Sequence, residues 1–347
     1  MTEEPTLVLT AQDVAELLTI DECIVAVEGA FRLLGMGKAK APGTLGIHVD
    51  GGGFHVKAGC LNLSRSYFAA KVNANFPSNP EQFGLPTIQG VILFCDAENG
   101  RLLAVMDSIT ITTLRTAAAT VVATKYLARS DVSVITICGC GSQGRIHLEA
   151  LASVRRRREA FAYDKNQACA ARFAEDLAQK LLIPVHPATE LSDATRQSDI
   201  VVTCTPSRQA FLGPDDVRPG TFIAAVGADN PEKSEIRPEL MSGSRVVVDL
   251  LEQCATIGDL HHALKAGAMT KTQVHAELGP IVAGKAPGRT TEDEIIIFDS
   301  TGLALQDVAA AAVVYEKARK ERRGLPVHFA PHVNGVPADA KSHVRLL

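Results

Sequence analysis

A glycine-rich loop between a predicted strand and a predicted helix constrains this chain more than any other feature. Residues 133–138 (SVITIC) form an apolar, β-prone run, the loop Gly139-Cys-Gly-Ser-Gln-Gly144 follows at once, and residues 145–154 have a helical pattern. This G-x-G-x-x-G order, placed between a strand and a helix, is typical of a doubly wound parallel sheet that binds a dinucleotide. The chain is therefore expected to contain a Rossmann fold of the α/β class.

The loop residues have separate roles in this interpretation. Gly139 permits the tight turn, Gly141 lets the backbone approach a pyrophosphate, and Gly144 allows the helix to pack closely. Ser142 and Gln143 lie at the helix start, where free N–H groups and the helix dipole favour an anion. All five are candidate cofactor-binding residues.

A carboxylate after the next predicted strand supports the same interpretation. Asp164 ends the apolar run 160–163 and lies twenty residues past Gly144, where it would accept hydrogen bonds from the adenosine ribose hydroxyls. Because a carboxylate repels a 2′-phosphate, NAD is the predicted cofactor. Lys165 beside it leaves NADP as the alternative.

Two patterns divide the chain into two predicted domains. Apolar runs alternate with helical or polar segments at 134–138, 160–163, 200–204, 222–226, 246–249 and 295–298, which is typical of a parallel sheet covered on both faces. The first 40 residues predict two helices, residues 44–106 an antiparallel sheet, and residues 112–128 a buried helix. An Ala-rich helix from Thr301 resembles that buried helix. We therefore expect a Rossmann domain at 131–301 and a discontinuous α+β domain made of 1–130 with 302–347.

Composition excludes several functional classes. Thirty-five Lys and Arg against thirty-nine Asp and Glu leave a net charge of -4, without the basic excess that nucleic-acid binding needs. The acidic start lacks the order of a signal peptide, and no uncharged apolar run approaches the length of a membrane span. Eight scattered cysteines without C-x-x-C fit reduced thiols in the cytoplasm, and no metal-binding motif is found.

Two cationic residues lie in apolar surroundings of the first domain. Lys71 shares one face of the predicted strand 67–76 with Asn73 and Asn75, and that face is directed either to solvent or to a site. Arg115 lies in the buried helix, and a buried guanidinium must find an anion. The sequence leaves open whether that anion is Asp107 or Asp96 in a structural pair, or a substrate carboxylate.

Three glycines at 51–53 predict a hairpin of 45–50 with 54–60. Alternation places Ile47, Val49, Phe54 and Val56 on one face and His48, His55 and Lys57 on the other. This second face is either exposed to solvent or part of a cavity wall.

Polar residues also follow two of the predicted parallel strands. Asp229 comes after the run 222–226, at the edge where open parallel sheets bind ligands, and is the candidate acid-base group. Its alternative role is to form the turn before Asn230-Pro231. After the run 295–298, Ser300 or Thr301 is expected to cap the next helix, with Ser300 also contacting the cofactor.

Together these motifs resemble the ornithine cyclodeaminase and mu-crystallin family. The similarity covers about 7–318, and its residues are 70–73 (AKVN), 84–90 (GLPTIQG), 114–118 (LRTAA), the Gly139 loop, 203–207 (TCTPS), 226–229 (VGAD) with Lys233 and Glu235, and 298–307.

The resemblance implies a homodimer in which the antiparallel sheets of two subunits form a closed barrel, while the Rossmann domain binds NAD or NADP. It implies that Lys71 and Arg115 hold a substrate carboxylate, with Lys71 also in the catalytic set, and that Asp229 is the acid-base residue. Thr116 matches a position near the cofactor phosphates, and Thr205 lies in a matched stretch expected to contact the cofactor.

The chain departs from the family pattern in three places. Members usually carry an Arg shortly after an Ala-Pro pair, whereas Ala41-Pro42 is followed here by Gly and Thr. The usual Met-Pro-Ala is replaced by 56–58 (VKA), and we hypothesise that Lys57 returns the missing charge to the substrate pocket. The cyclodeaminases tend to have Gly-Gly-Asp where residues 227–229 are Gly-Ala-Asp, which weakens an ornithine assignment.

The expected function is hydride transfer between nicotinamide and the α-carbon of an amino acid or its imine, as in an amino-acid dehydrogenase or imine reductase. The first alternative is an ornithine cyclodeaminase-type ammonia lyase with catalytic NAD. The second is a non-catalytic protein that retains a dinucleotide, as mu-crystallins can, although Asp229 argues against it because mu-crystallins lack an acid there.

Overall fold

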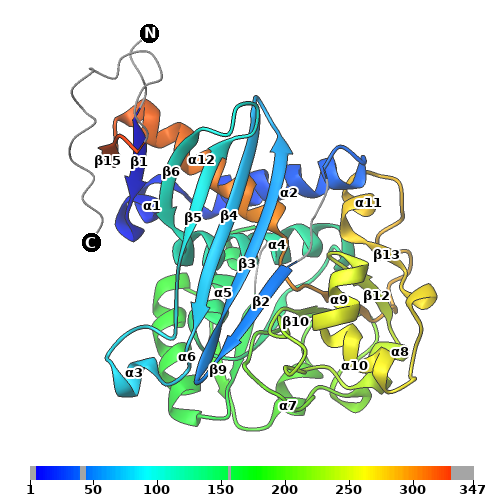
Figure 1. The fold of residues 1–347 in the computed structure, drawn as a ribbon. Helices are drawn as coiled ribbons and strands as arrows, with labels where there is room; N and C mark the ends of the chain where they lie inside the picture. The colour runs from blue at the N-terminus through cyan, green and yellow to red at the C-terminus, as the bar shows by residue number, and fades with distance from the viewer. Residues whose placement is uncertain (1–4, 40–43, 155–157, 330–347) are drawn as a thin grey trace, which may run out of the picture.

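A computed structural model of the chain describes residues 5–39, 44–154 and 158–329 (Figure 1). The described residues form two sheets, each with its own helices. The Ala41-Pro42 departure from the family pattern lies outside the described residues. The same is true of the first three residues of the basic run 155–158, which are predicted to be solvated cations that complement the dipole at the end of the helix after the glycine loop.

The larger sheet has eight parallel strands in the order β13-β12-β14-β11-β10-β7-β8-β9. Its strands are β7 (Val134–Cys138), β8 (Glu159–Tyr163), β9 (Val185–Ala188), β10 (Ile200–Thr203), β11 (Phe222–Ala225), β12 (Arg245–Val248), β13 (Ala276–Glu277) and β14 (Ile296–Asp299). Its helices are α5 (Ser142–Val154), α6 (Gln167–Leu181), α7 (Leu191–Thr195), α8 (Pro238–Ser242), α9 (Leu251–Ile257), α10 (Asp259–Lys265) and α11 (Leu278–Val282). Strands β7, β10, β11 and β14 are buried at every position, because helices cover both faces.

The strand order reverses beside β7, and this reversal places the cofactor loop. From β7 the chain moves outward through β8 and β9, then returns to add β10 on the other side. The loops after β7 and β10 therefore diverge at the edge where open parallel sheets bind ligands.

The smaller sheet has seven strands in the order β15-β1-β6-β5-β4-β3-β2. They are β1 (Thr6–Leu9), β2 (Thr44–Val49), β3 (Gly52–Asn62), β4 (Ser66–Asn75), β5 (Ile88–Asp96), β6 (Leu102–Asp107) and β15 (Leu325–Val327). The helices are α1 (Ala11–Leu17), α2 (Ile20–Gly35), α3 (Asn79–Gln82), α4 (Ser108–Leu127) and α12 (Ala304–Glu321). In Figure 1 the orange α12 lies with the blue and cyan N-terminal elements, so the end of the described chain returns to the fold of its beginning.

Helices α4 and α12 connect the smaller sheet to the rest of the molecule. Helix α12 packs on β3 and β4, and α4 packs on β5, on α5 and on β11. Both are Ala-rich and buried around most of their circumference. This burial was expected because their sequences lack a polar face. The opposite face of β2–β5 keeps large apolar side chains exposed, namely Leu45, Ile47, Val49, Phe54, Val91 and Leu93.

The predicted fold class is confirmed, and four strands were missed, one of them β15 at the end of the described chain. Strand β1 lies in the stretch predicted to be helical and pairs in parallel with β6, so the smaller sheet is not wholly antiparallel. Strands β9 and β13 are short additions to the edges of the parallel sheet. The predicted hairpin is formed by β2 and β3, and its register places Ile47 opposite Phe54 and Thr44 opposite Lys57. The domain boundaries at 130/131 and 301/302 stay a prediction.

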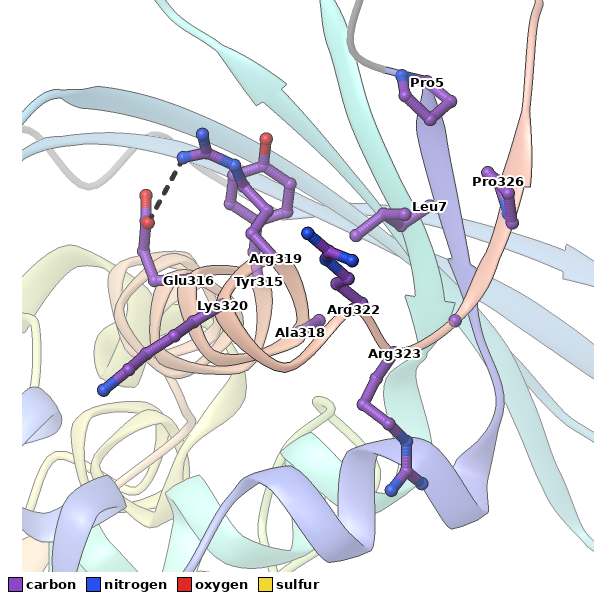
Figure 2. A pocket seen from close by; sticks show the side chains of 11 residues that line it. Pro5, Leu7, Tyr315, Glu316, Ala318, Arg319, Lys320, Arg322, Arg323 and Pro326 are labelled. Atoms are coloured by element: carbon purple, nitrogen blue, oxygen red, sulfur yellow. Dashed lines mark hydrogen bonds and ion pairs between the residues drawn. The ribbon is translucent and has the colours of Figure 1, made fainter.

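A basic groove of about 550 Å³ lies at the C-terminal end of α12 (Figure 2). Arg319 forms an ion pair with Glu316 one turn earlier on α12 at 3.5 Å, while Arg322 is directed into the groove and Arg323 turns away toward α1. At 1.5 Å per residue, the eighteen residues of α12 place this groove about 27 Å from the N-terminal end of the helix.

Among the described residues, none of the helices combines the length and the apolar character that a membrane span needs.

Candidate active site

The glycine loop leaves open space where a ligand's phosphates would lie. Gly139 has a φ of +106°, and a Cβ on Gly144 would lie 2.1 Å from the Gly139 carbonyl oxygen, so neither position accepts a side chain. A Cβ on Gly141 would meet nothing within 4 Å. Helix α5 begins at Ser142, so its free amides face this space. The loop therefore fits a bound pyrophosphate.

Asp164, at the end of β8, holds the glycine loop in place by a hydrogen bond. Its Oδ2 accepts a hydrogen bond from the Cys140 amide and its Oδ1 one from the Asn166 amide, both at 2.9 Å. Each carboxylate oxygen keeps a further lone pair for a ribose hydroxyl. Asp164 also lines a cavity of about 490 Å³ that extends from Gly139 to Thr205 and Phe211.

A second cavity, of about 270 Å³, adjoins the first through Thr205 and Pro206, which line both. It collects most of the side chains that were singled out in the sequence: Lys57, Arg115, Thr116, Gln143, Thr205, Asp229 and Ser300. Gln143 Oε1 is buried and has no hydrogen-bond partner among the described residues. An unpartnered buried acceptor in a ligand cavity is consistent with a missing bound group.

Lys71 and Arg115 share one buried carboxylate. Lys71 Nζ lies 2.8 Å from Asp307 Oδ2, and Arg115 Nε donates to Asp307 Oδ1 at 3.1 Å. Arg115 Nη1 also donates to Gln306 Oε1 at 2.9 Å. The three charged residues are at most 6% exposed. Lys71 is thus a buried residue of the site, directed away from solvent.

The protein anion of Arg115 is therefore Asp307, and the suggested pairs with Asp107 and Asp96 are wrong. Asp107 caps α4 by accepting a hydrogen bond from the Thr110 amide at 2.8 Å, and Asp96 pairs with Arg65. Asp307 lies 192 residues from Arg115. Its signal in the sequence is a lone carboxylate in the Ala-rich helix that begins at Ala304.

Burial changes the protonation of this cluster. Burial is the main cause that lowers the pKa of Lys71 to about 7, Asp307 opposes it, and the charges of Arg115 and Lys57 lower it further. Burial would raise the pKa of Asp307, but Lys71 and Arg115 lower it overall. Lys71 can therefore exchange a proton near neutral pH.

Asp229 follows β11 and projects into the second cavity. Its side chain is 53% exposed and lies 2.8 Å from Lys233 Nζ. The surrounding protein would raise the pKa of Asp229, but Lys233, and then Lys57 and His55, lower it overall. The turn in this loop is built by Asn230 instead, because Asn230 Oδ1 accepts the amides of Glu232 and Lys233. The carboxylate of Asp229 is thus free of the turn-forming role.

Ser300 and Thr301 do not cap α12, and that prediction is wrong. The helix begins at Ala304 after Leu303, which makes no side-chain cap. Both hydroxyls donate instead to buried Asp249, at 3.3 and 3.1 Å, and the Gly302 amide donates to the same carboxylate at 2.7 Å. Ser300 nevertheless lines the second cavity. Thr116 lines it too, with its hydroxyl donating to the Thr112 carbonyl at 2.7 Å.

Buried carboxylates support the loops beneath the site. In the sequence, Glu235 was named only as part of the family resemblance, without a role, and Asp259 was missed. Glu235 accepts hydrogen bonds from the Thr205 amide and hydroxyl, at 2.6 and 2.7 Å, and from the Gly227 amide at 3.0 Å. Asp259 Oδ1 accepts the Glu235 amide at 2.8 Å, whereas its Oδ2 has no partner among the described residues. Burial, and then the charge of Asp259, raise the pKa of Glu235 to about 7, and burial raises that of Asp259 to about 6.

Comparison with known proteins gives one consistent result. Residues 4–322 match the model of the ornithine cyclodeaminase/mu-crystallin family. An archaeal alanine dehydrogenase dimer with bound NAD is similar, with 39% identity and a TM-score of 0.90 over 94% of this chain and 99% of that chain. The Δ1-pyrroline-2-carboxylate reductase of Thermococcus litoralis, solved with NADH and L-proline, has 36% identity and a TM-score of 0.89 over 93% and 100%. The iminosuccinate reductase of Paracoccus denitrificans, solved with NAD+, has 30% identity and a TM-score of 0.87 over 93% and 99%.

The raised carboxyl pKa values predict a loss of stability as the pH rises. Glu235 and Asp259 bind protons more tightly in the folded chain, so their contribution is complete below their ordinary pKa values and is lost as the pH rises through about 6 to 7. Asp259→Asn retains the Oδ1 acceptor and places an amide on the unpartnered side. Between about pH 5 and about pH 8 the free energy of unfolding should fall in both proteins. We expect the fall to be smaller in this variant than in the wild type by about 1 to 3 kcal/mol.

Urea unfolding at several pH values measures this difference. Glu175→Gln, at an exposed position of α6, is the control for loss of one negative charge, and it should follow the wild type. An unchanged pH dependence in Asp259→Asn would show that the buried carboxylates are not its source.

Proposed function

Because the chain belongs to the ornithine cyclodeaminase/mu-crystallin family, we propose that it is an NAD-dependent oxidoreductase that acts at the α-carbon of a small amino acid or its imine. The named relatives, dehydrogenases and imine reductases solved with NAD, NADH or NAD+, support this activity and this cofactor. The observation that carries the proposal is that Gln143 of the glycine loop, Arg115 and Asp229 all line one cavity.

The cofactor would lie across both cavities. The amides of residues 139–144 would hold the pyrophosphate, with Thr116 nearby, and Asp164 would bind the adenosine ribose. Gln143, Thr205 and Ser300 would contact its nicotinamide half, since all three line the second cavity. When bound there, the nicotinamide supplies the hydride acceptor or donor at the α-carbon of the substrate.

The cation cluster would hold the substrate carboxylate. Lys71 and Arg115 share the single negative charge of Asp307, so the three side chains retain one positive charge beside the cavity. A carboxylate bound to Arg115 would complete the neutralisation of this charge. Fixing the carboxylate also fixes the α-carbon, and orientation of this kind provides much of the rate enhancement in such reactions.

Asp229 would exchange the proton on the substrate nitrogen. In the oxidative direction Asp229 would accept a proton from the amine as the C=N bond forms, and the hydride that leaves the α-carbon would go to a nicotinamide bound in the cavity. The lowered pKa of Asp229 keeps it a carboxylate near neutral pH, as a base requires. Lys71, with a pKa of about 7, would gain or lose a proton during turnover and so change the positive charge beside the substrate carboxylate.

A screen of amino acids and cyclic imines, each with NAD(H) and NADP(H), tests this function. Amino-acid dehydrogenation should accumulate NADH in proportion to substrate oxidised, and imine reduction should consume it. A cyclodeaminase would instead release ammonia with no net change in absorbance. Tight cofactor binding without turnover of any substrate would contradict the proposal and favour a dinucleotide-retaining protein.

Replacing the proposed base separates catalysis from cofactor binding. Asp229→Asn should lower kcat by about 100-fold or more, because proton transfer by a positioned group contributes this much. Its NADH affinity, measured by fluorescence titration, should stay within about threefold, since the glycine loop is unaltered. Glu239→Gln, at an exposed position of α8, is the control and should retain wild-type activity. A near-normal rate in Asp229→Asn would remove Asp229 from the mechanism.

We also infer that the chain is a homodimer located in the cytoplasm. The outer face of β2–β5 is apolar and exposed in the single chain, and patches of this kind on a sheet are commonly interfaces. A dimeric neighbour supports this assembly. All eight cysteines are free, which is typical of a reducing compartment.

A charge on this outer face should separate the subunits. Ile47 and Val91 are 49% and 43% exposed there, so Ile47→Glu and Val91→Glu would each bury a carboxylate in the interface. Sedimentation velocity should then find a monomer where the wild type is a dimer. Val25→Glu, at a 73% exposed position on α2, is the matched control and should stay dimeric. Dimers of both sheet variants as tight as those of the wild type would place the interface elsewhere.

A further inference from the structure

Lys57 brings a second positive centre into the active-site cavity. It extends from β3, and its Nζ donates to the carbonyl oxygens of Thr301 and Gly302, both at 2.8 Å. No carboxylate of the described residues forms an ion pair with it. An ammonium group has three N–H donors, so one remains for a ligand.

Arg115 reinforces the positive potential at the same backbone segment. A Cβ on Gly302 would lie 2.3 Å from Arg115 Nη1, so the guanidinium lies against this glycine, whose carbonyl binds Lys57. Arg115 is neutralised in part by Asp307, but Lys57 has only carbonyl dipoles. Partly buried charges require an anion more strongly than exposed ones do.

The charges around the cavity do not balance. Four basic side chains and two carboxylates lie in or beside the cavity, which leaves a net charge of +2 when Lys71 is protonated, as it is below its pKa of about 7: Lys57, Lys71, Arg115 and Lys233 with Asp229 and Asp307. Burial lowers the pKa of His55, two positions before Lys57 on β3, so this histidine adds no charge at neutral pH. Asp249 lies behind the 301–302 backbone, where its oxygens accept the Gly302 amide and neighbouring hydroxyls. With Lys71 protonated, one substrate carboxylate would leave one positive charge uncompensated, and Lys57 is the cation that has no carboxylate partner among the described residues.

Lys57 on one side and Lys71 with Arg115 on the other are placed to contact different ends of a short substrate. Lys57 and Lys71 are directly opposite each other on β3 and β4, so their Cβ atoms are about 5 Å apart. From there Lys71 turns to Asp307, whereas Lys57 turns to Thr301 and Gly302. The cavity has a volume of about 270 Å³, which suits a short substrate beside the nicotinamide.

We propose that Lys57 binds a side-chain carboxylate, and that the preferred substrate is a short amino dicarboxylic acid of aspartate length or its imine. This assignment rests on the proposed function. The α-carboxylate occupies Arg115 and Lys71, the second carboxylate occupies the free donor of Lys57, and the hydride and proton transfers at the α-carbon and nitrogen are unchanged. Lys57 is thus a specificity-determining residue.

L-Aspartate and L-asparagine test this inference, because they differ chiefly in the side-chain charge. For NAD reduction by the full-length wild type, we expect kcat/KM with L-aspartate to exceed that with L-asparagine or L-alanine at least tenfold. Lys57→Met should reduce the aspartate-to-asparagine ratio about 30-fold, as expected when a buried charge loses its partner. Lys57→Arg should retain the preference. Lys180→Met, which breaks the exposed pair with Glu149 on α5, is the control.

Two results would overturn the inference. The first is a wild type that oxidises L-alanine or L-asparagine as efficiently as L-aspartate. The second is a Lys57→Met variant in which kcat/KM falls alike for all three substrates, which would place Lys57 in the α-carboxylate site or in a purely structural contact. Thermal unfolding of the variant distinguishes these two roles. Failure of the proposed function is a separate outcome, since the wild type would then turn over no amino or imino acid at all.

Discussion

Asp307 is the residue on which the geometry of the active site depends. It extends from the first turns of α12 and holds Lys71 of β4 and Arg115 of α4 together in the protein interior. Removing one partner of a buried ion pair leaves an uncompensated charge and costs several kcal/mol. The same carboxylate therefore joins three elements of the smaller sheet and its helices, and it leaves a single positive charge beside the cofactor cavity.

Much of the fold could be predicted because continuous apolar runs and glycines report local structure directly. The run that became β7 has the predicted bounds, and the glycine loop and α5 follow it as expected. The missed strands are short and carry weak patterns. Strand β9 buries only its end residues, and β1 has four residues next to a helical repeat. Their place in a sheet is decided by tertiary pairing, which a local pattern does not report.

The candidate site could be predicted as a set of residues but not as a set of contacts. Sequence position placed Arg115 in a buried helix and Asp229 after a parallel strand, and the structure brings both to one cavity. The partners of these residues were hidden because they are distant in the chain. Asp307 is 236 residues from Lys71, and Asp249 is 53 residues from the Gly302 amide that it binds. Burial can be inferred from periodicity, but the identity of a buried partner depends on the complete topology.

The alternation of side chains along β3 links two properties that would otherwise be independent. Lys57 is on the face that lines the cavity, and its neighbour Val56 is on the outer, apolar face. An insertion or deletion of one residue within β3 would exchange these faces, moving the lysine into the apolar surface and the valine into the cavity. Length variation among descendants of this chain should therefore be confined to the turn at Asp50 and Gly51. Within the strand, one alternation of side chains determines both which residues line the cavity and which residues form the outer apolar face.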